Sequence, residues 1–211
     1  MLMSMEGLSE TYMARGVSGI LHVGAHEGQE HAAYREAFGP DIPIVWIEGD
    51  PDVYERLVKL MANDLNSVCL NAVVADRVST VEFHIANNEQ SSSILPLGTH
   101  KEAHPEVVYI GGVTVETTTI DILASQYDLF ESLNFLNMDV QGAEGKVIAG
   151  AYEFLKGVDF VYSEVNQREL YVGCTTLDDF NDQMKVHGFR MTELDMIESF
   201  GWGDAFYVKG K

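Results

Sequence analysis

The hydrophobic pattern of this chain alternates between short apolar runs and amphipathic segments. Unbroken apolar runs are typical of strands buried on both faces of a parallel sheet. They occupy residues 20–23, 42–49, 67–75, 133–139 and 158–165. Apolar residues at helical spacing predict helices between them, over residues 28–38, 51–61, 142–157 and 175–189. Strands that alternate with helices predict an α/β fold, with a mostly parallel central sheet covered by helices on both faces.

The remaining segments predict a leader, a loop and further strands in one domain of 211 residues. Residues 1–17 are expected to form a helical leader, with the helix itself over residues 5–15. Polar and turn residues mark 87–112 as a long loop, which we expect near the substrate site. Residues 114–128 predict a strand that leads into a helix. Additional strands are predicted over residues 80–86, 190–196 and 205–209.

The charge balance narrows the choice of partners. The chain has 13 basic and 33 acidic residues, and its net charge of −20 opposes binding to nucleic acid. The chain has no apolar run of about 20 residues, and its first residues lack the basic flank and apolar stretch of a signal peptide. We therefore expect a cytoplasmic protein without membrane insertion. Cys69 and Cys174 stand apart and suggest neither a zinc site nor a disulfide framework, and nothing in the pattern indicates an oligomeric state.

The segment GILHVGAHEGQE, residues 19–30, contains a strand that ends in a glycine-bounded turn. The turn lacks the lysine and hydroxyl residue of an ATP-binding loop, and it lacks the GxGxxG pattern of dinucleotide sites. Glu48 ends the next strand, where a carboxylate is placed to bind ribose hydroxyls. A ribose-binding acid without a phosphate cradle favours S-adenosylmethionine. Alternatively, Gly24 and Gly28 form only a tight turn, and Glu48 is a solvated strand end.

Five segments of the chain resemble the FkbM family of S-adenosylmethionine-dependent O-methyltransferases. They read HVGAHEG, WIEGDPD, NAVVADRVSTVEF, VETTTIDIL and LNMDVQGAEGKVIAGA, and the likeness runs over about residues 19–190. The resemblance implies a Rossmann-like class I methyltransferase fold with an antiparallel C-terminal edge. It also implies transfer of a methyl group to a hydroxyl of a sugar or glycan.

Carried over to this sequence, the resemblance implies a set of residues that bind S-adenosylmethionine. They are His22, Gly24, Ala25, His26, Gly28, Glu48, Gly49, Asn71, Ala72, Val73, Ser92 and Asp139. Three positions depart from the family pattern, because His22 stands where the family usually has Asp, His26 where Asn is common, and Gln141 where Glu is common. The departure at residue 22 leaves open how the amino group of the cofactor is neutralised.

Asp139 and Glu164 are the candidate catalytic residues, because each ends a core strand beside the expected cofactor position. A sugar hydroxyl must lose its proton, so Asp139 is expected to act as the base or as a metal ligand. The two carboxylates offer oxygen ligands to a divalent cation such as Mg²⁺. Two alternatives stay open, since Asp139 could only cap the following helix, and the two acids could bind substrate rather than a metal. His100 and His104 face either the acceptor or water.

Two other classes of function stay open at this point. An NAD(P)-dependent sugar oxidoreductase or epimerase uses a similar sheet, although the chain lacks both GxGxxG and a YxxxK pair. A catalytically silent module that binds the cofactor is the second alternative. A nucleic-acid methyltransferase is disfavoured by the charge and by the absence of an N-P-P-Y or D-P-P-Y segment after the fourth core strand.

Overall fold

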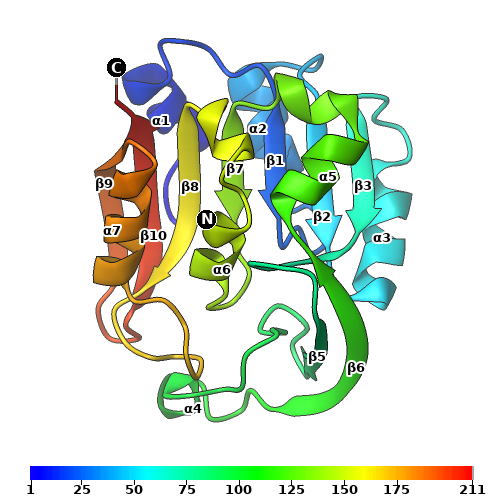
Figure 1. Ribbon diagram of the computed structural model, residues 1–211, viewed down its shortest axis with the longest axis vertical. Coiled ribbons are helices and arrows are strands. Elements are labelled where there is room, and N and C mark those ends of the chain that lie inside the picture. The colour runs from blue at the N-terminus through cyan, green and yellow to red at the C-terminus, as the bar shows by residue number, and fades with distance from the viewer. Residues whose placement is uncertain (211) are drawn as a thin grey trace.

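The main sheet of the protein has seven strands in the order β3-β2-β1-β7-β8-β10-β9 (Figure 1). The computed structural model describes residues 1–210. From β3 to β8 all neighbouring strands pair in parallel, whereas β10 runs antiparallel to both β8 and β9. The strands are β1 (Ile20–Val23), β2 (Ile44–Glu48), β3 (Ser67–Asn71), β7 (Phe135–Met138), β8 (Phe160–Asn166), β9 (Phe189–Ile197) and β10 (Trp202–Lys209). The predicted parallel sheet with an antiparallel C-terminal edge is confirmed.

Helices cover both faces of this sheet because successive strand residues point to opposite sides. One core contains Val45 and Ile47 of β2 and lies under α5, α6 and α7. The other contains Ile44 and Trp46 and lies under α1, α2 and α3. The helices are α1 (Met5–Tyr12), α2 (His31–Phe38), α3 (Pro51–Met61), α5 (Ile120–Gln126), α6 (Glu144–Ala149) and α7 (Leu177–Val186), with 3₁₀ turns η1 (Asp128–Ser132) and η2 (Phe154–Lys156). Within residues 1–210, no helix is long and apolar enough to cross a membrane.

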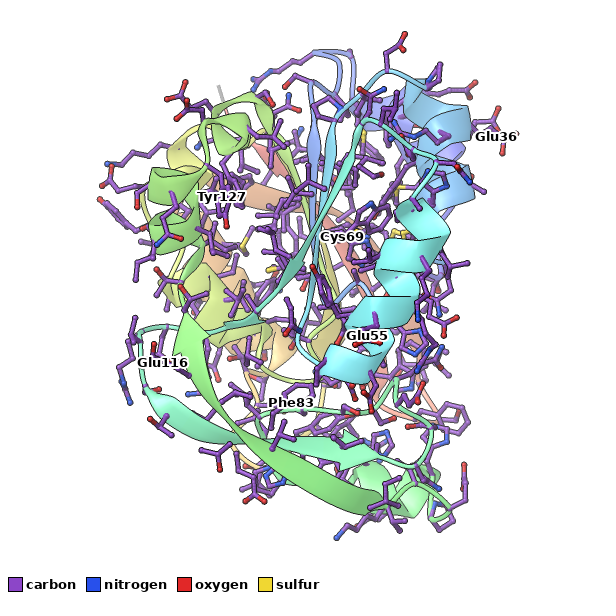
Figure 2. All side chains as sticks on the ribbon, turned by 90° about the vertical axis from the view of Figure 1, so that its right-hand side faces the viewer. Glu36, Glu55, Cys69, Phe83, Glu116 and Tyr127 are labelled. Carbon is purple, nitrogen blue, oxygen red and sulfur yellow. The ribbon has the colours of Figure 1, made fainter. Side chains whose placement is uncertain are left out.

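A second, three-stranded sheet lies beyond the carboxyl ends of the main strands (Figure 1). Its strands, in the order β4-β6-β5, are β4 (Val73–Val74), β5 (Thr80–Ala86) and β6 (Tyr109–Thr118). The short helix α4 (His100–Ala103) lies at the same end of the molecule. Figure 2 shows Phe83 of β5 between this small sheet and the main one. The small sheet therefore covers the edge where parallel sheets bind ligands.

Several element boundaries differ from the sequence-based expectation. The expected strand over 67–75 is two strands, because the chain leaves the main sheet at Ala72 and β4 pairs with β6 instead. The expected loop over 87–112 contains α4 and the beginning of β6. The expected helix over 142–157 ends at Ala149, and Gly150 caps it in close contact with the chain at Ala75, where a Cβ would lie 2.2 Å from the carbonyl oxygen. The helices expected over 5–15 and 28–38 are likewise shorter, α1 ending at Tyr12 and α2 beginning at His31.

Candidate functional site

A cleft of about 530 Å³ opens between the carboxyl ends of the main strands and the small sheet. One part, the β1–β2 half, is lined by Gly24, Ala25, Glu48, Gly49 and Val73. The other part, the α4 half, is lined by His100, His104, Leu170, Tyr171 and Trp202. Asp139, Gln141 and Glu164 line the cleft at the ends of β7 and β8.

The turn after β1 lies directly against the end of β7. Gly24 has a φ of +80°, and a Cβ at this position would lie 1.8 Å from the carbonyl oxygen of Asp139. The amides of Gly24 and Ala25 both donate to the carbonyl of Ile47, at 2.9 and 3.0 Å. Only glycine combines this left-handed conformation with so close an approach of two backbones. The turn therefore presents backbone, rather than side chains, beside Asp139.

Glu48 holds the two turns of the β1–β2 half together. Its side chain is 8% exposed, and its two carboxylate oxygens accept hydrogen bonds from the amides of His26 and Asp50, each at 2.7 Å. Burial raises the pKa of Glu48 to about 7, even though these hydrogen bonds favour its ionised form. Each carboxylate oxygen has lone pairs left for a ligand that enters the cleft.

An apolar wall of the cleft lies beside Glu48. It is lined by Gly49, Ala72, Val73, Val74 and Phe83. Gly49 packs directly against two of these side chains, because a Cβ on it would come within 2.9 Å of Val73 and 3.3 Å of the ring of Phe83. A flat, apolar ring can pack against a wall of this kind.

Asp139 and Glu164 are connected by the side chain of Gln141. The Gln141 amide donates to Asp139 Oδ1 at 2.5 Å, and it lies 3.5 Å from Glu164 Oε2. Desolvation by the surrounding protein raises the pKa of Asp139 to about 6, although its carboxylate is open to the cleft. Burial and the charge of Asp139 raise the pKa of Glu164 well above its usual range. The two acids therefore differ in proton affinity, so near neutral pH Glu164 keeps a proton more readily than Asp139 does.

Glu144 stabilises the loop between β7 and α6, which carries Gln141. It is 2% exposed, and its Oε1 atom accepts hydrogen bonds from the amides of Val140 and Gly142 at 3.1 and 3.2 Å. Burial and the charge of Asp139 raise the pKa of Glu144 to about 7. The same loop places Gln141 in a left-handed conformation with φ +54°. Glu144 thus fixes the loop that positions Gln141.

The α4 half of the cleft is built around buried aromatic rings. The ring of His100 lies 5.4 Å from that of Tyr171 and 5.1 Å from that of His104. His100 is 7% exposed, burial lowers its pKa, and its Nδ1 atom has no hydrogen-bond partner within residues 1–210. The hydroxyl of Tyr171 donates to Gln141 Oε1 at 2.5 Å. The unpaired Nδ1 atom of this imidazole is itself buried, and the ring packs beside Tyr171, which belongs to the Gln141 network.

A family model for the methyltransferase FkbM domain matches residues 22–191, and this range contains all of the acids that line the ends of β2, β7 and β8. This chain belongs to the FkbM methyltransferase family. The 2-O-methyltransferase NoeI of Sinorhizobium fredii (strain NBRC 101917 / NGR234) is 30% identical over 161 residues. The matched region is 73% of this chain and 65% of NoeI, so the chain spans slightly less than two thirds of that relative.

Solved structures show the same fold as this FkbM chain. A methyltransferase FkbM from Methylobacillus flagellatus KT superposes with a TM-score of 0.60 at 13% identity, covering 91% of this chain and 43% of that one. Magnesium protoporphyrin IX methyltransferase from Synechocystis PCC 6803, solved with bound SAM, superposes with a TM-score of 0.53 at 7% identity. That match covers 98% of this chain and 77% of that one. The fold is the Rossmann-like class I methyltransferase fold.

Most of the site residues predicted for this FkbM chain line one cleft. They are His22, Gly24, Ala25, His26, Glu48, Gly49, Ala72, Val73, Ser92, Asp139 and Glu164. Gly28 does not, because it packs against α3, where a Cβ would lie 2.6 Å from Met61. Asn71 does not either, since its amide turns back to the carbonyl of Glu48 at 2.8 Å. Gly28 and Asn71 therefore lie next to the cleft-lining segments of the chain without lining the cleft themselves.

Other residues of the cleft were not predicted from the sequence. Glu30 and Asp204 line it, as does Leu2, whose amide donates to Asp204 Oδ2 at 2.5 Å and to the hydroxyl of Tyr162 at 3.1 Å. No short motif relates Leu2 to Asp204, which are 202 positions apart. Strand β10 begins at Trp202, three residues before the strand expected over 205–209.

Asp139 and Glu164 are also the predicted ligands of a divalent cation. Among residues 1–210, no three His, Cys, Asp or Glu side chains are grouped so that they could hold a metal ion. Mg²⁺ takes six oxygen ligands, and two carboxylates supply part of such a set.

Proposed function

We propose that this protein transfers the methyl group of S-adenosylmethionine to a hydroxyl of a sugar or glycan. Membership of the FkbM family and the similarity to NoeI, a 2-O-methyltransferase, support this reaction class. The observation that carries the proposal is the closeness of the Gly24 turn to Asp139. A backbone turn suited to the cofactor and a carboxylate suited to the acceptor thereby share one cleft.

The β1–β2 half of the cleft fits the nucleoside part of S-adenosylmethionine. Glu48 accepts hydrogen bonds from the ribose hydroxyls, and the adenine ring packs against the apolar wall formed by Val73, Val74 and Phe83. Within the described chain, no Lys or Arg lines the cleft, which is consistent with a ligand that has no phosphate. When bound, S-adenosylmethionine supplies an electrophilic methyl group on a positively charged sulfur.

Asp139 and Glu164 have distinct roles toward the acceptor. With a pKa of about 6, Asp139 is mostly ionised at neutral pH and takes the proton of the acceptor hydroxyl. Glu164, whose pKa is raised well above the usual range, keeps its proton and donates a hydrogen bond to a neighbouring oxygen. Gln141 holds the Asp139 carboxylate in place. Since methyl transfer is an in-line displacement, holding the acceptor oxygen in line is the main task of these residues.

The α4 half of the cleft receives the remainder of the acceptor. Trp202 and His104 line this half and offer aromatic faces to a sugar ring, whereas Tyr171 and His100 are buried and support the wall. A carboxylated or phosphorylated acceptor is disfavoured, because Glu106 and Asp204 also line the cleft.

Calorimetric titration with S-adenosylhomocysteine tests the cofactor half of the proposal. We expect binding to the wild type and at least a tenfold loss of affinity for Glu48→Ala, because ribose hydrogen bonds to a charged group are lost. Glu116→Ala is the matched control, since Glu116 lies exposed on β6 (Figure 2) and outside the cleft. Tight binding of NAD without a response to S-adenosylhomocysteine would instead indicate an oxidoreductase.

Methyl transfer to a panel of uncharged glycosides and oligosaccharides tests the acceptor half. We expect Asp139→Asn to lose transfer at least a hundredfold and to keep its affinity for S-adenosylhomocysteine. Full activity of that variant would remove the base assignment. A wild type that binds the cofactor but transfers to no acceptor with a free hydroxyl would identify a silent module.

A further inference from the structure

Three buried polar side chains form a hydrogen-bonded row that ends at the cleft. Asn137 of β7, Tyr34 of α2 and His22 of β1 are 2%, 0% and 3% exposed. The side-chain amide of Asn137 donates to the hydroxyl oxygen of Tyr34, and that hydroxyl lies 3.1 Å from Nδ1 of His22. Of the three, His22 lines the cleft. The row therefore connects the interior of the protein to a ring at the surface where a ligand binds.

The direction of these hydrogen bonds fixes the position of the proton on His22. Because the oxygen of Tyr34 accepts from Asn137 and is buried, its own proton has its acceptor in Nδ1 of His22. Burial lowers the pKa of His22, while the nearby charges of Glu30 and of the amino group of Met1 shift this pKa in opposite directions. The imidazole is therefore neutral near pH 7, and a neutral ring that accepts at Nδ1 carries its proton on Nε2.

The Nε2–H group of His22 is open to a ligand. Within residues 1–210, the hydrogen bond to Tyr34 is the one that the His22 ring makes, and Nε2 does not belong to the fully buried atoms that lack a partner. Since the ring lines the cleft, a ligand there reaches Nε2. An N–H group held by a buried network is pre-organised for an oxygen acceptor, and it offers no lone pair to an ammonium group.

The sheet places His22 beside the amino-acid part of the proposed cofactor. In the register of the strands, His22 pairs with Trp46 on β2 and with Asn137 on β7. It therefore lies between the strand that ends in Glu48 and the strand that leads to Asp139, on the same face as both acids. With the ribose at Glu48 and the methyl group toward Asp139, the methionine part lies near His22. Its carboxylate accepts hydrogen bonds, whereas its ammonium group only donates them.

We propose that Asn137 and Tyr34 hold His22 as the Nε2–H tautomer, and that this N–H donates to the carboxylate of the methionine part of S-adenosylmethionine. The inference rests on the proposed cofactor. His22 is the residue that touches the cofactor, whereas Tyr34 and Asn137 are positioning residues that act through it. A tautomer fixed in advance lowers the cost of binding, because in an unrestrained imidazole either nitrogen carries the proton.

Long-range ¹H–¹⁵N NMR of the ligand-free, ¹⁵N-histidine-labelled protein measures the tautomer, with His22 assigned from the signal lost in His22→Gln. We expect the wild-type ring to be protonated at Nε2 and unprotonated at Nδ1. Tyr34→Phe keeps the aromatic ring but removes the proton given to Nδ1, so a mixture of both tautomers should appear. Tyr127→Phe, at a half-exposed position outside the cleft (Figure 2), should leave the His22 signal unchanged. A proton on Nδ1 in the wild type, or an unchanged His22 signal in Tyr34→Phe, would overturn the positioning role.

Calorimetry with two ligands tests the contact with the carboxylate. S-adenosylhomocysteine carries this group, whereas its decarboxylated analogue keeps the nucleoside, the sulfur and the ammonium group. We expect His22→Leu to weaken S-adenosylhomocysteine about 10- to 100-fold, the range for a lost hydrogen bond to a charged group, and the analogue by less than about twofold. The affinity for the analogue also reports that the variant is folded.

The conservative variant and the wild type complete this test. The amide of His22→Gln carries an N–H close to the position of Nε2 and should recover part of the affinity for S-adenosylhomocysteine. Equal weakening of both ligands by His22→Leu would overturn the carboxylate contact. A wild type that binds neither ligand would overturn the proposed cofactor and this contact with it, while NMR of the ligand-free protein still decides whether Tyr34 fixes the tautomer.

Discussion

The β1–β2 half of the cleft is built from residues close in sequence, whereas the α4 half joins distant segments. His26 and Glu48, which hydrogen-bond each other, are 22 positions apart. In the α4 half, the hydroxyl of Thr99 donates to the carbonyl of Glu169 at 3.1 Å, 70 positions away. The first half consists mainly of backbone turns on adjacent parallel strands, and the second consists mainly of side chains on separate loops.

This difference affects how each half responds to substitution. A backbone turn is specified by a left-handed glycine and a close approach, so a single added carbon disrupts it. A wall of side chains is specified by packing and hydrogen bonds, so it tolerates small changes with graded effects. We therefore expect large, all-or-none effects in the β1–β2 half and moderate effects on turnover in the α4 half.

The largest expected effect comes from Gly24→Ala. The added Cβ would collide with the carbonyl oxygen of Asp139 at 1.8 Å, so the end of β7 has to move. We expect the free energy of unfolding in urea to fall by more than about 4 kcal/mol, with loss of S-adenosylhomocysteine binding. Gly16→Ala is the control, since Gly16 has nearly the same φ, +79°, with nothing within 4 Å of a Cβ, and should cost about 1–2 kcal/mol. Equal losses of unfolding free energy in the two variants would show that the left-handed backbone conformation, and not the contact with β7, determines the cost of a Cβ at residue 24.

A second prediction concerns the pH dependence created by the buried Glu144. Its pKa is about 7 in the folded protein against 4.5 for an unperturbed Glu, so the folded state binds the proton more tightly. This contribution to stability is present below about pH 4.5 and is lost as the pH rises through 7. Glutamine mimics the protonated form, because one oxygen, Oε1, accepts both amide hydrogen bonds. Glu144→Gln should match the wild type at pH 5 and exceed it by about 2–3 kcal/mol at pH 8.

Urea unfolding of both proteins at pH 5, 6.5 and 8 measures this difference. The control is Glu55→Gln, an exposed position on α3 (Figure 2), which should shift the free energy of unfolding by less than about 0.5 kcal/mol at each pH. A constant difference between Glu144→Gln and the wild type across this range would contradict the raised pKa.

The sequence predicted the β1–β2 half better than the α4 half, for a physical reason. Apolar runs identify buried strands, and their ends place Gly24 and Glu48 at one edge of a parallel sheet without further knowledge. The partners of Tyr171 and Asp204 depend on tertiary packing, which no period in the sequence records. Strand β6 was missed in part because Gly111 and Gly112 interrupt its alternation, although both pair with β5.

A third prediction tests whether the α4 half acts on Asp139. The Tyr171 hydroxyl donates to Gln141, which in turn donates to Asp139. In Tyr171→Phe the ring still packs, but Gln141 loses one partner and holds the carboxylate less firmly. We expect kcat for methyl transfer to fall about tenfold, with the affinity for S-adenosylhomocysteine within about twofold. Tyr127→Phe, at a half-exposed position distant from the cleft (Figure 2), should change neither. An unchanged kcat for Tyr171→Phe would show that Gln141 is held by its backbone alone.

The smallest expected effect is at Arg56, which connects the turn after β1 to the loop after β5 across the surface. Its guanidinium pairs with Glu27 in the turn after β1, at 2.6 Å, and with Glu89 in the loop after β5. All three side chains are more than a third exposed, so solvent screens the attraction. We expect Arg56→Met to lower the free energy of unfolding by less than about 1 kcal/mol, with even less loss in 0.5 M salt. Lys59→Met on the same helix removes an exposed pair with Glu55 and serves as the control. A loss above about 2 kcal/mol would mean that the loop after β5 depends on this ion pair, and that this loop and the turn after β1 are coupled more tightly than screened surface contacts indicate.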